Sequence, residues 1–120
     1  MGNGFYFELY EQLFKNCFIH SSRYANGNLQ LSLFGFDDSI KQIAHFADIT
    51  LNQKKRKLKN NEIIVDCKFR PNLIPQLKSL GVIKEQVGIF ADKSTLYPIY
   101  TIDQAKVNQN SYCMHELVAA

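Results

Sequence analysis

The sequence predicts an α+β domain: a mostly antiparallel, curled sheet of about five to six strands, with one short helix packed on one face. Three observations lead to this fold class. Short runs with alternating apolar and polar residues follow one another, which is typical of antiparallel strands with one covered face. Asn26-Gly27 is a strong hairpin signal between two such runs. Residues 71–81 have leucines at helical spacing.

The length of 120 residues indicates one domain, and we expect it to span residues 1–106 with a C-terminal tail at 107–120. Apolar residues make up 46% and charged residues 21%, as in ordinary globular proteins. The net charge of +3 permits contact with nucleic acid or an acidic partner, but it argues against an acidic mimic of DNA.

The cysteines Cys17, Cys67 and Cys113 are odd in number and have no close pair spacing, so we expect reduced thiols and a cytoplasmic protein. No basic segment followed by an apolar one opens the chain, and we expect no signal peptide. No apolar run reaches the roughly 20 residues of a membrane span, so no membrane partner is expected.

The first segment, Phe5 to Phe14, fits two patterns. Phe5, Phe7 and Leu9 alternate as in a strand, whereas a second set of apolar residues falls at helical spacing, which we slightly favour. Residues 18–25 then form a strand, and Asn26-Gly27 suits a type I′ turn because both residues tolerate positive φ.

The strands after this turn are expected at 29–36, 43–51 and 62–67. In the first of them the apolar residues change face at Gly35, which predicts a β-bulge there. Asp37-Asp38 suits turn chemistry better than a cation site. The residues 62–67 are rich in β-branched side chains, which favour strands.

The predicted helix begins near Asn72, a suitable N-cap, and ends at Gly81, a suitable C-cap. A closing hairpin follows, with strands at 87–91 and 96–102. Pro98 marks the second as an edge strand because proline cannot donate to a ladder. Residues 108–111 are expected to be a linker.

Residue patterns for catalysis or metal binding are weak. His20 and Ser22 share a strand face without an orienting acid, and His45 lies on an apolar face, where a hydrogen-bonded core histidine is the expected case. Cys113 and His115 are two residues apart, but structural zinc sites normally have two short paired spacings. We therefore expect no enzyme activity, no cofactor and no metal.

The basic segment 54–59 is the strongest candidate site. It holds five of the fourteen basic residues of the chain, Lys54, Lys55, Arg56, Lys57 and Lys59, between two predicted strands. Such a loop would form a mobile positive finger for phosphates or an acidic groove, or it would only keep strand edges soluble. Tyr97, Tyr100 and Phe90 would add a stacking surface, although aromatic residues on strands more often belong to the core.

The chain resembles a small uncharacterised family carried on conjugative elements and prophages. The residues that carry the resemblance are Tyr24-Ala25-Asn26-Gly27-Asn28-Leu29, Ile49-Thr50-Leu51-Asn52, Leu80-Gly81 and Leu96-Tyr97-Pro98-Ile99-Tyr100. It covers roughly residues 24–103; the more basic loop and the added tail depart from it. The resemblance implies no catalytic residues, and it implies a mobile-element protein in the cytoplasm of a bacterial host.

Three functions follow as hypotheses. The first is an anti-CRISPR type of inhibitor, which binds the effector complex of a host defence nuclease or its guide RNA. The second is a protein that sequesters a cyclic nucleotide signal in a pocket lined by Lys, Arg and Tyr. The third is a nucleic-acid-binding accessory factor for element transfer. The oligomeric state, monomer or homodimer, stays open at this level.

Overall fold

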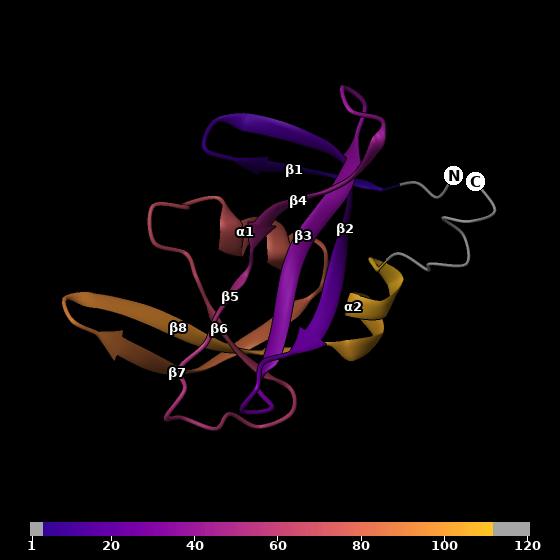
Figure 1. The fold of residues 1–120 in the computed structure, drawn as a ribbon. Helices are drawn as coiled ribbons and strands as arrows, with labels where there is room; N and C mark the ends of the chain where they lie inside the picture. Colours follow the sequence, from indigo (N-terminus) through magenta and orange to yellow (C-terminus); the bar gives the residue numbers. More distant parts are fainter. Residues whose placement is uncertain (1–3, 112–120) are drawn as a thin grey trace.

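The structure is a computed structural model that describes residues 4–111. These residues form two four-stranded antiparallel sheets, ordered β1-β2-β3-β4 and β5-β6-β8-β7, and two short helices (Figure 1). The strands are β1 (Phe5–Leu9), β2 (Gln12–Arg23), β3 (Leu29–Asp37), β4 (Gln42–Asp48), β5 (Thr50–Leu51), β6 (Glu62–Val65), β7 (Ile83–Asp92) and β8 (Thr95–Ile102). The helices are α1 (Leu73–Ser79) and α2 (Gln104–Gln109).

The predicted α+β class and antiparallel pairing are confirmed, but the strand count and the single helix are wrong. One cause is Ile49, in the middle of the strand expected at 43–51. The N–H of Ile49 donates to the Leu31 carbonyl in the first sheet (2.9 Å), and its carbonyl accepts from Asp66 beside the second (2.9 Å). The chain therefore leaves one sheet and enters the other within a single apolar run.

The N-terminal segment forms strands and not the helix that its spacing slightly favoured. Phe7 and Leu9 are buried, as the alternating pattern requires, and β1 pairs with β2 through the two-residue turn Tyr10-Glu11. Tyr10 and Glu11 have φ of 52° and 63°, the two positive angles of a type I′ turn. The strand pattern and the helix pattern of this segment are similar in strength. Burial of Phe7 and Leu9 on one face of β1 decides in favour of the strand.

The main core lies between the two sheets and takes side chains from both. Its members include Ile19, Leu31 and Leu33 of the first sheet and Ile63 and Tyr100 of the second. The second sheet also has a packed outer face, where Leu58, Ile64, Tyr97 and Ile99 form a smaller cluster. The adjacent β6 residues Ile63 and Ile64 thus point into different clusters, one on each face of the second sheet. Because Leu58 belongs to the outer cluster, the loop that carries it packs on the outer face of this sheet.

Helix α1 closes the outer edge of β1. The Gln76 carboxamide accepts from the Glu8 N–H and donates to the Glu8 carbonyl, both at 2.7 Å, as a neighbouring strand would. Gly81 has a φ of 75° and follows the helix as predicted. Asn72 is the N-cap residue, but its side chain makes no cap bond and donates instead to the Glu8 carboxylate (3.0 Å).

Helix α2 occupies the region expected as a domain boundary and linker. Its N-cap residue, Asp103, accepts from the N–H groups of Ala105 and Lys106, and Val107 is wholly buried in the main core. The Asn110 carbonyl then accepts from the N–H of Ile19 in β2 (2.8 Å), which brings α2 beside β2 (Figure 1). The packed domain thus extends past residue 106, and the expected tail beyond residue 111 lies outside the described residues.

Two strand predictions are corrected. β8 lies between β6 and β7, so Pro98 is not on an edge strand; it stands just beyond Ile99, where the pairing with β6 ends and no donor is needed. The bulge is in β4 and not in β3: Leu33 pairs with Ala47 and Phe34 with His45, which leaves Phe46 as the extra residue. Gly35 leaves space for the Phe46 ring, which a Cβ at this position would meet. Neither described helix has the length and apolar character to cross a bilayer.

Candidate functional site

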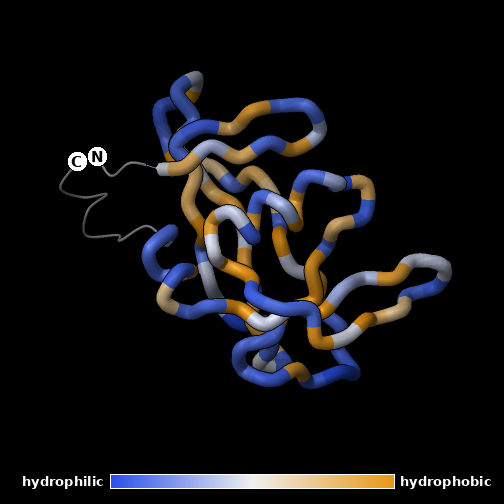
Figure 2. The backbone as a smooth tube through the Cα atoms, turned by 180° about the vertical axis from the view of Figure 1, so that it is seen from behind, coloured by the Kyte–Doolittle hydropathy of each residue, from blue (hydrophilic) through white to orange (hydrophobic). Residues whose placement is uncertain are grey.

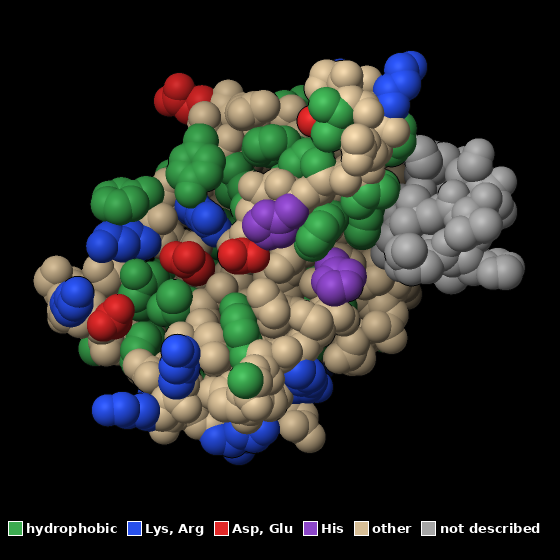
Figure 3. Space-filling model, in the orientation of Figure 1, with side chains coloured by type: hydrophobic (Ala, Val, Ile, Leu, Met, Phe, Trp, Pro, Cys, Tyr) green, Lys and Arg blue, Asp and Glu red, His purple; other side chains and the backbone are tan. Residues whose placement is uncertain are grey.

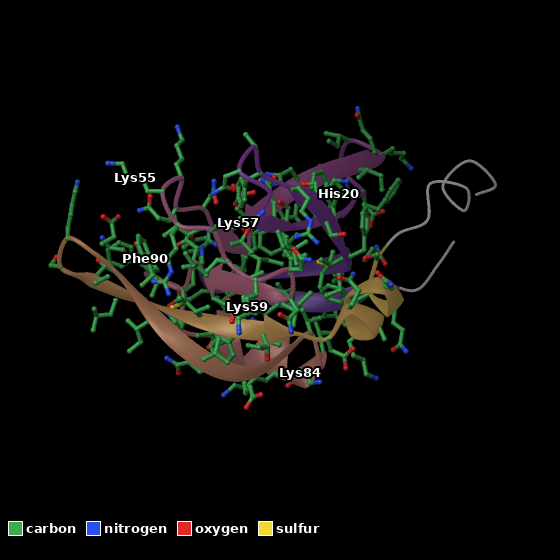
Figure 4. All side chains as sticks on the ribbon, turned by 90° about the horizontal axis from the view of Figure 1, so that it is seen from below. His20, Lys55, Lys57, Lys59, Lys84 and Phe90 are labelled. Atoms are coloured by element: carbon green, nitrogen blue, oxygen red, sulfur yellow. The ribbon has the colours of Figure 1, made fainter. Side chains whose placement is uncertain are left out.

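The basic loop between β5 and β6 exposes all five of its cations. Lys54, Lys55, Arg56, Lys57 and Lys59 are exposed, while Leu58 among them is only 7% exposed. Viewed from below, Lys55, Lys57 and Lys59 spread across the underside of the molecule, with Lys84 of β7 nearby at its edge (Figure 4). The candidate interface predicted from the sequence is therefore accessible at its basic residues.

A buried asparagine holds this loop in place. Asn28 is 3% exposed, and its amide nitrogen donates to the Arg56 carbonyl (2.8 Å) and to the Asn52 side chain (3.1 Å). Its side-chain oxygen accepts from the N–H of Leu58 (2.9 Å). These bonds satisfy a polar group that would otherwise cost free energy to bury.

The hairpin turn before Asn28 makes further contacts with the loop. Asn26 donates to the Gln53 carbonyl (3.1 Å), and the Lys57 ammonium donates to the Asn26 carbonyl (3.1 Å). Only Gly27 of the Asn26-Gly27 pair has positive φ, at 90°, so the predicted type I′ turn is wrong. The Gly27 N–H bonds the Tyr24 carbonyl (2.8 Å), as in a three-residue loop that ends in a left-handed glycine.

The sequence predicted that the basic segment would be a mobile finger. In the structure these contacts hold the loop against the rest of the domain. Leu58 packs in the outer cluster of the second sheet, and the turn of the first sheet bonds the loop on its other side. The backbone that carries the cations therefore has a defined course, which reduces the backbone entropy lost when the loop meets a row of phosphates. Lysine and arginine are the usual side chains that contact nucleic-acid phosphates, and phosphate contacts carry no sequence readout.

The predicted stacking tyrosines are in the core. Tyr97 and Tyr100 are 7% and 6% exposed and belong to the two clusters on opposite faces of the second sheet. Their rings are thus not available as a platform for bases, and of the two alternatives that the sequence left open, the core role is the one observed. The Phe90 ring stacks on Tyr97 at a centroid distance of 6.3 Å and is partly exposed.

The two described histidines lie on the outer face of the first sheet, where Figure 3 shows them in purple beside apolar side chains. Both contact the Phe34 ring edge-on, His20 at 5.4 Å and His45 at 5.1 Å between ring centroids. His45 also lies 2.9 Å from the Asp48 carboxylate. Its side chain is 47% exposed and thus not in the core, because the pairing of β3 with β4 shifts at this point.

The described residues hold no group of three or more His, Cys, Asp or Glu side chains placed to bind a metal ion. Cys113 and His115, the sequence pair considered for zinc, lie outside the described residues. Burial raises the pKa of the Cys17 thiol to about 12 and raises the pKa of the Cys67 thiol. A high thiol pKa disfavours the thiolate that nucleophilic catalysis needs.

A pocket of about 380 Å³, which the sequence did not indicate, lies where the β1–β2 turn meets the segment before α1. Its lining includes Tyr10, Glu11, Phe69 and Arg70, and three of these, Tyr10, Glu11 and Phe69, have positive φ. Arg70 donates to the Tyr10 hydroxyl (2.8 Å) and to the carbonyls of Asp48 and Asp66. Phe69 is 81% exposed. The pocket is therefore lined by three residues with positive φ, one of which, Phe69, also has an exposed aromatic ring.

Comparison of the chain with protein-family models, curated proteins and solved structures gave no match. The expected relation to proteins of mobile elements stays a prediction.

Proposed function

We propose that this protein is a non-enzymatic binding protein whose basic loop, Lys54 to Lys59, docks on the phosphate backbone of a nucleic acid. The observation that carries this proposal is the fastening of the loop: five exposed cations stand on a backbone held by Asn28 and by the buried Leu58. A solubilising turn needs charge but does not need such fixed geometry.

The nucleic acid we propose is the guide RNA of a host defence nuclease, so that binding blocks the effector complex. This step rests on the resemblance to proteins of mobile elements, where an inhibitor of host defence is a frequent cargo. The loop supplies phosphate contacts alone, which suits a target recognised by its charge and shape. An accessory factor for element transfer would use the same loop on DNA.

The first experiment measures binding of fluorescent single-stranded RNA, RNA hairpin and duplex DNA by anisotropy over a range of salt concentrations. The test variant is the triple change Lys54→Gln, Lys55→Gln, Lys59→Gln, at exposed positions of the loop. We expect weaker binding and a log–log salt slope that is smaller by about three, because each phosphate contact contributes about one.

A matched control removes the same number of charges elsewhere. Lys15→Gln, Lys41→Gln and Lys93→Gln are exposed positions outside the loop, and their combination changes the net charge equally. We expect affinity and salt slope close to those of the unaltered protein. Equal losses in the two triple variants would mean that net charge alone drives binding, and the loop would then not be the interface.

The link to an effector complex has a separate test. The protein is immobilised and used to capture complexes from host lysate, with and without ribonuclease treatment, and the loop variant is run beside it. We expect capture of a nuclease complex that is lost after ribonuclease treatment and lost in the loop variant. Capture of DNA without a nuclease would favour the transfer factor instead.

The pocket at Tyr10 and Arg70 favours a second candidate, sequestration of a cyclic nucleotide. Phe69 is exposed enough for its ring to stack on a base, and the volume of about 380 Å³ is in the range of small-ligand sites. Glu8 and Glu11 in the lining oppose a phosphate, so this candidate ranks below the first. Equilibrium dialysis with labelled cyclic nucleotides tests it: Phe69→Ala should abolish retention, and no retention by the unaltered protein rejects it.

A further inference from the structure

The hairpin of β7 and β8 places an aromatic ring on the outer face of the second sheet. It extends from the body of the molecule as an arm (Figure 1), and Figure 2 shows hydrophobic segments along it. Phe90 pairs with Tyr97 and Gly88 pairs with Ile99, in a part of the hairpin whose register has no shift. Because Tyr97 and Ile99 belong to the outer cluster, Phe90 and Gly88 lie on the outer face as well.

This outer face also carries the basic loop. Leu58 anchors the loop in the outer cluster, and Phe90 packs against the same cluster. Figure 4 shows the Phe90 and Lys55 side chains on the same side of the molecule. The ring therefore lies at the border of the surface that we propose for phosphates.

The Phe90 ring is supported on one side and is partly open to solvent. It stacks on Tyr97 with a centroid distance of 6.3 Å and an interplanar angle of 24°. Tyr97 is only 7% exposed, so it gives the Phe90 ring a rigid support. A ring that is already held in one orientation loses little further entropy when a flat ligand stacks on it. An aromatic ring beside a basic surface is the arrangement that binds unpaired bases and their phosphates together.

Gly88 is a second feature of this face, and the fold does not require a glycine there. Its φ is not positive, in contrast to Gly27 and Gly81. Apart from its chain neighbours, a Cβ at this position would have only Ile99 among the described residues within 4 Å, at an ordinary contact distance of 3.5 Å. Glycine inside a strand weakens it and often marks a place where a ligand approaches closely. The missing side chain leaves space beside the Phe90 ring.

We propose that Phe90 and Gly88 form a subsite for one unpaired base of a single-stranded RNA. The base stacks on the Phe90 ring and occupies the space above Gly88, while neighbouring phosphates contact the basic loop. A base inside a duplex is stacked between its neighbours and cannot reach the ring, so the subsite selects unpaired nucleotides. Stacking accepts every base, because each has a flat aromatic face.

This inference rests on the proposed function, since the loop supplies the electrostatic attraction for the RNA. It adds the part of the RNA that is recognised: the unpaired part of the guide and not its helical part. The loop and the ring contribute differently to binding. Contacts of the loop with phosphates depend on salt, whereas stacking on an uncharged ring does not release counterions.

The test measures binding of a short oligouridylate and of a short RNA duplex by anisotropy over a series of salt concentrations. Phe90→Leu keeps an apolar side chain beside Tyr97 but removes the flat ring. We expect its affinity for the oligouridylate to fall by about fivefold or more. Its affinity for the duplex and its log–log salt slope should not change, because no charge is removed. Phe90→Tyr keeps a ring and should bind the oligouridylate like the unaltered protein.

Gly88→Val tests the space beside the ring while the ring itself stays. Valine is favourable in strands, and we expect a loss of oligouridylate affinity similar to that of Phe90→Leu. Ile89→Ala is the matched control, because Ile89 is 55% exposed and lies on the opposite face of the same strand. It should change neither affinity nor salt slope. Circular dichroism and thermal unfolding check that each variant keeps the fold.

Photocrosslinking gives a direct readout on the unaltered protein. An oligouridylate that contains iodouridine crosslinks to an aromatic ring on which the base stacks, and we expect the crosslinked peptide in mass spectrometry to contain Phe90. If the triple loop variant weakens binding but Phe90→Leu and Gly88→Val leave the oligouridylate affinity unchanged, the subsite is wrong and the proposed function stands. No RNA binding by the unaltered protein would overturn both.

Discussion

The buried side-chain oxygen of Asn28 accepts a 2.9 Å hydrogen bond from the backbone N–H of Leu58, thirty residues further along the chain. The same side chain donates to the carbonyl of Arg56, so one asparagine binds the backbone on both sides of Lys57. This relationship joins the turn before β3 to the loop before β6. It makes the geometry of the basic surface depend on a residue with no charge.

Replacing Asn28 by alanine should loosen the loop and destabilise the domain. The change leaves a buried N–H and a carbonyl without their partner, which costs about 2–3 kcal/mol of unfolding free energy. Urea unfolding measures the loss, and limited trypsin digestion should show faster cleavage after the lysines of the loop. Asn60→Ala, at an exposed position of the same loop, is the control and should change neither measurement.

Gly27→Ala should destabilise the turn that holds the loop. Gly27 has a φ of 90°, where an L-residue is strained, and an added Cβ would collide with the Lys57 ammonium. We expect a loss of about 1–2 kcal/mol, measured by thermal unfolding. Gly27→Asn separates the two causes, because asparagine tolerates positive φ but carries the same Cβ. Equal losses in both variants would assign the effect to the collision.

Glu11→Gly should stabilise the protein. Glu11 has a φ of 63° in the type I′ turn between β1 and β2, a conformation that glycine adopts without strain. We expect a gain of about 0.5–1 kcal/mol in chemical unfolding, because the relieved strain exceeds the added entropy of the unfolded chain. Glu11→Ala removes the same carboxylate but keeps the strain, and it should give no gain. A gain in both variants would point to the charge and not to the backbone.

The stability should fall as the pH rises above the ordinary range of a thiol. Burial raises the pKa of Cys17 from 9.0 to about 12, so between these values the folded protein keeps a proton that the unfolded chain has lost. The contribution of the protonated Cys17 thiol to the free energy of unfolding is complete below pH 9 and is lost as the pH approaches 12. Across this window the free energy of unfolding should fall by at most about 1.4 kcal/mol per pH unit. Urea titrations across this window measure the slope.

Cys17→Ala should reduce this slope without removing it. Burial also raises the pKa of the Tyr24 hydroxyl, so its ionisation acts in the same direction. The thiol of Cys17 should react slowly with thiol reagents in the folded protein at neutral pH. Rapid modification there, or an unchanged slope in the alanine variant, would contradict the role of the buried thiol.

Local sequence patterns determined most of the antiparallel strands, the helix α1 and the composition of the basic loop. Alternation placed Leu29, Leu31 and Leu33 in the core, and Gly81 marked the end of α1, because both signals act within a few residues. The same patterns could not decide between strand and helix for Phe5 to Phe14, where a ten-residue window supports both periods. The N-cap residue of α2, Asp103, is a helix signal in the sequence. The helix was not predicted because the residues that follow are mostly polar and only Val107 among them is buried.

The tertiary structure alone decided how these parts meet. The sequence by itself determined that the five basic residues Lys54, Lys55, Arg56, Lys57 and Lys59 would be exposed, since lysine and arginine are rarely buried. Only the fold decided that Leu58 is buried, that Asn28 bonds the loop and that Tyr97 and Tyr100 are core residues. Only the fold brought Tyr10 to Arg70 and left β7 with an open side. These outcomes depend on contacts between residues far apart in the chain, which short periodic patterns do not encode.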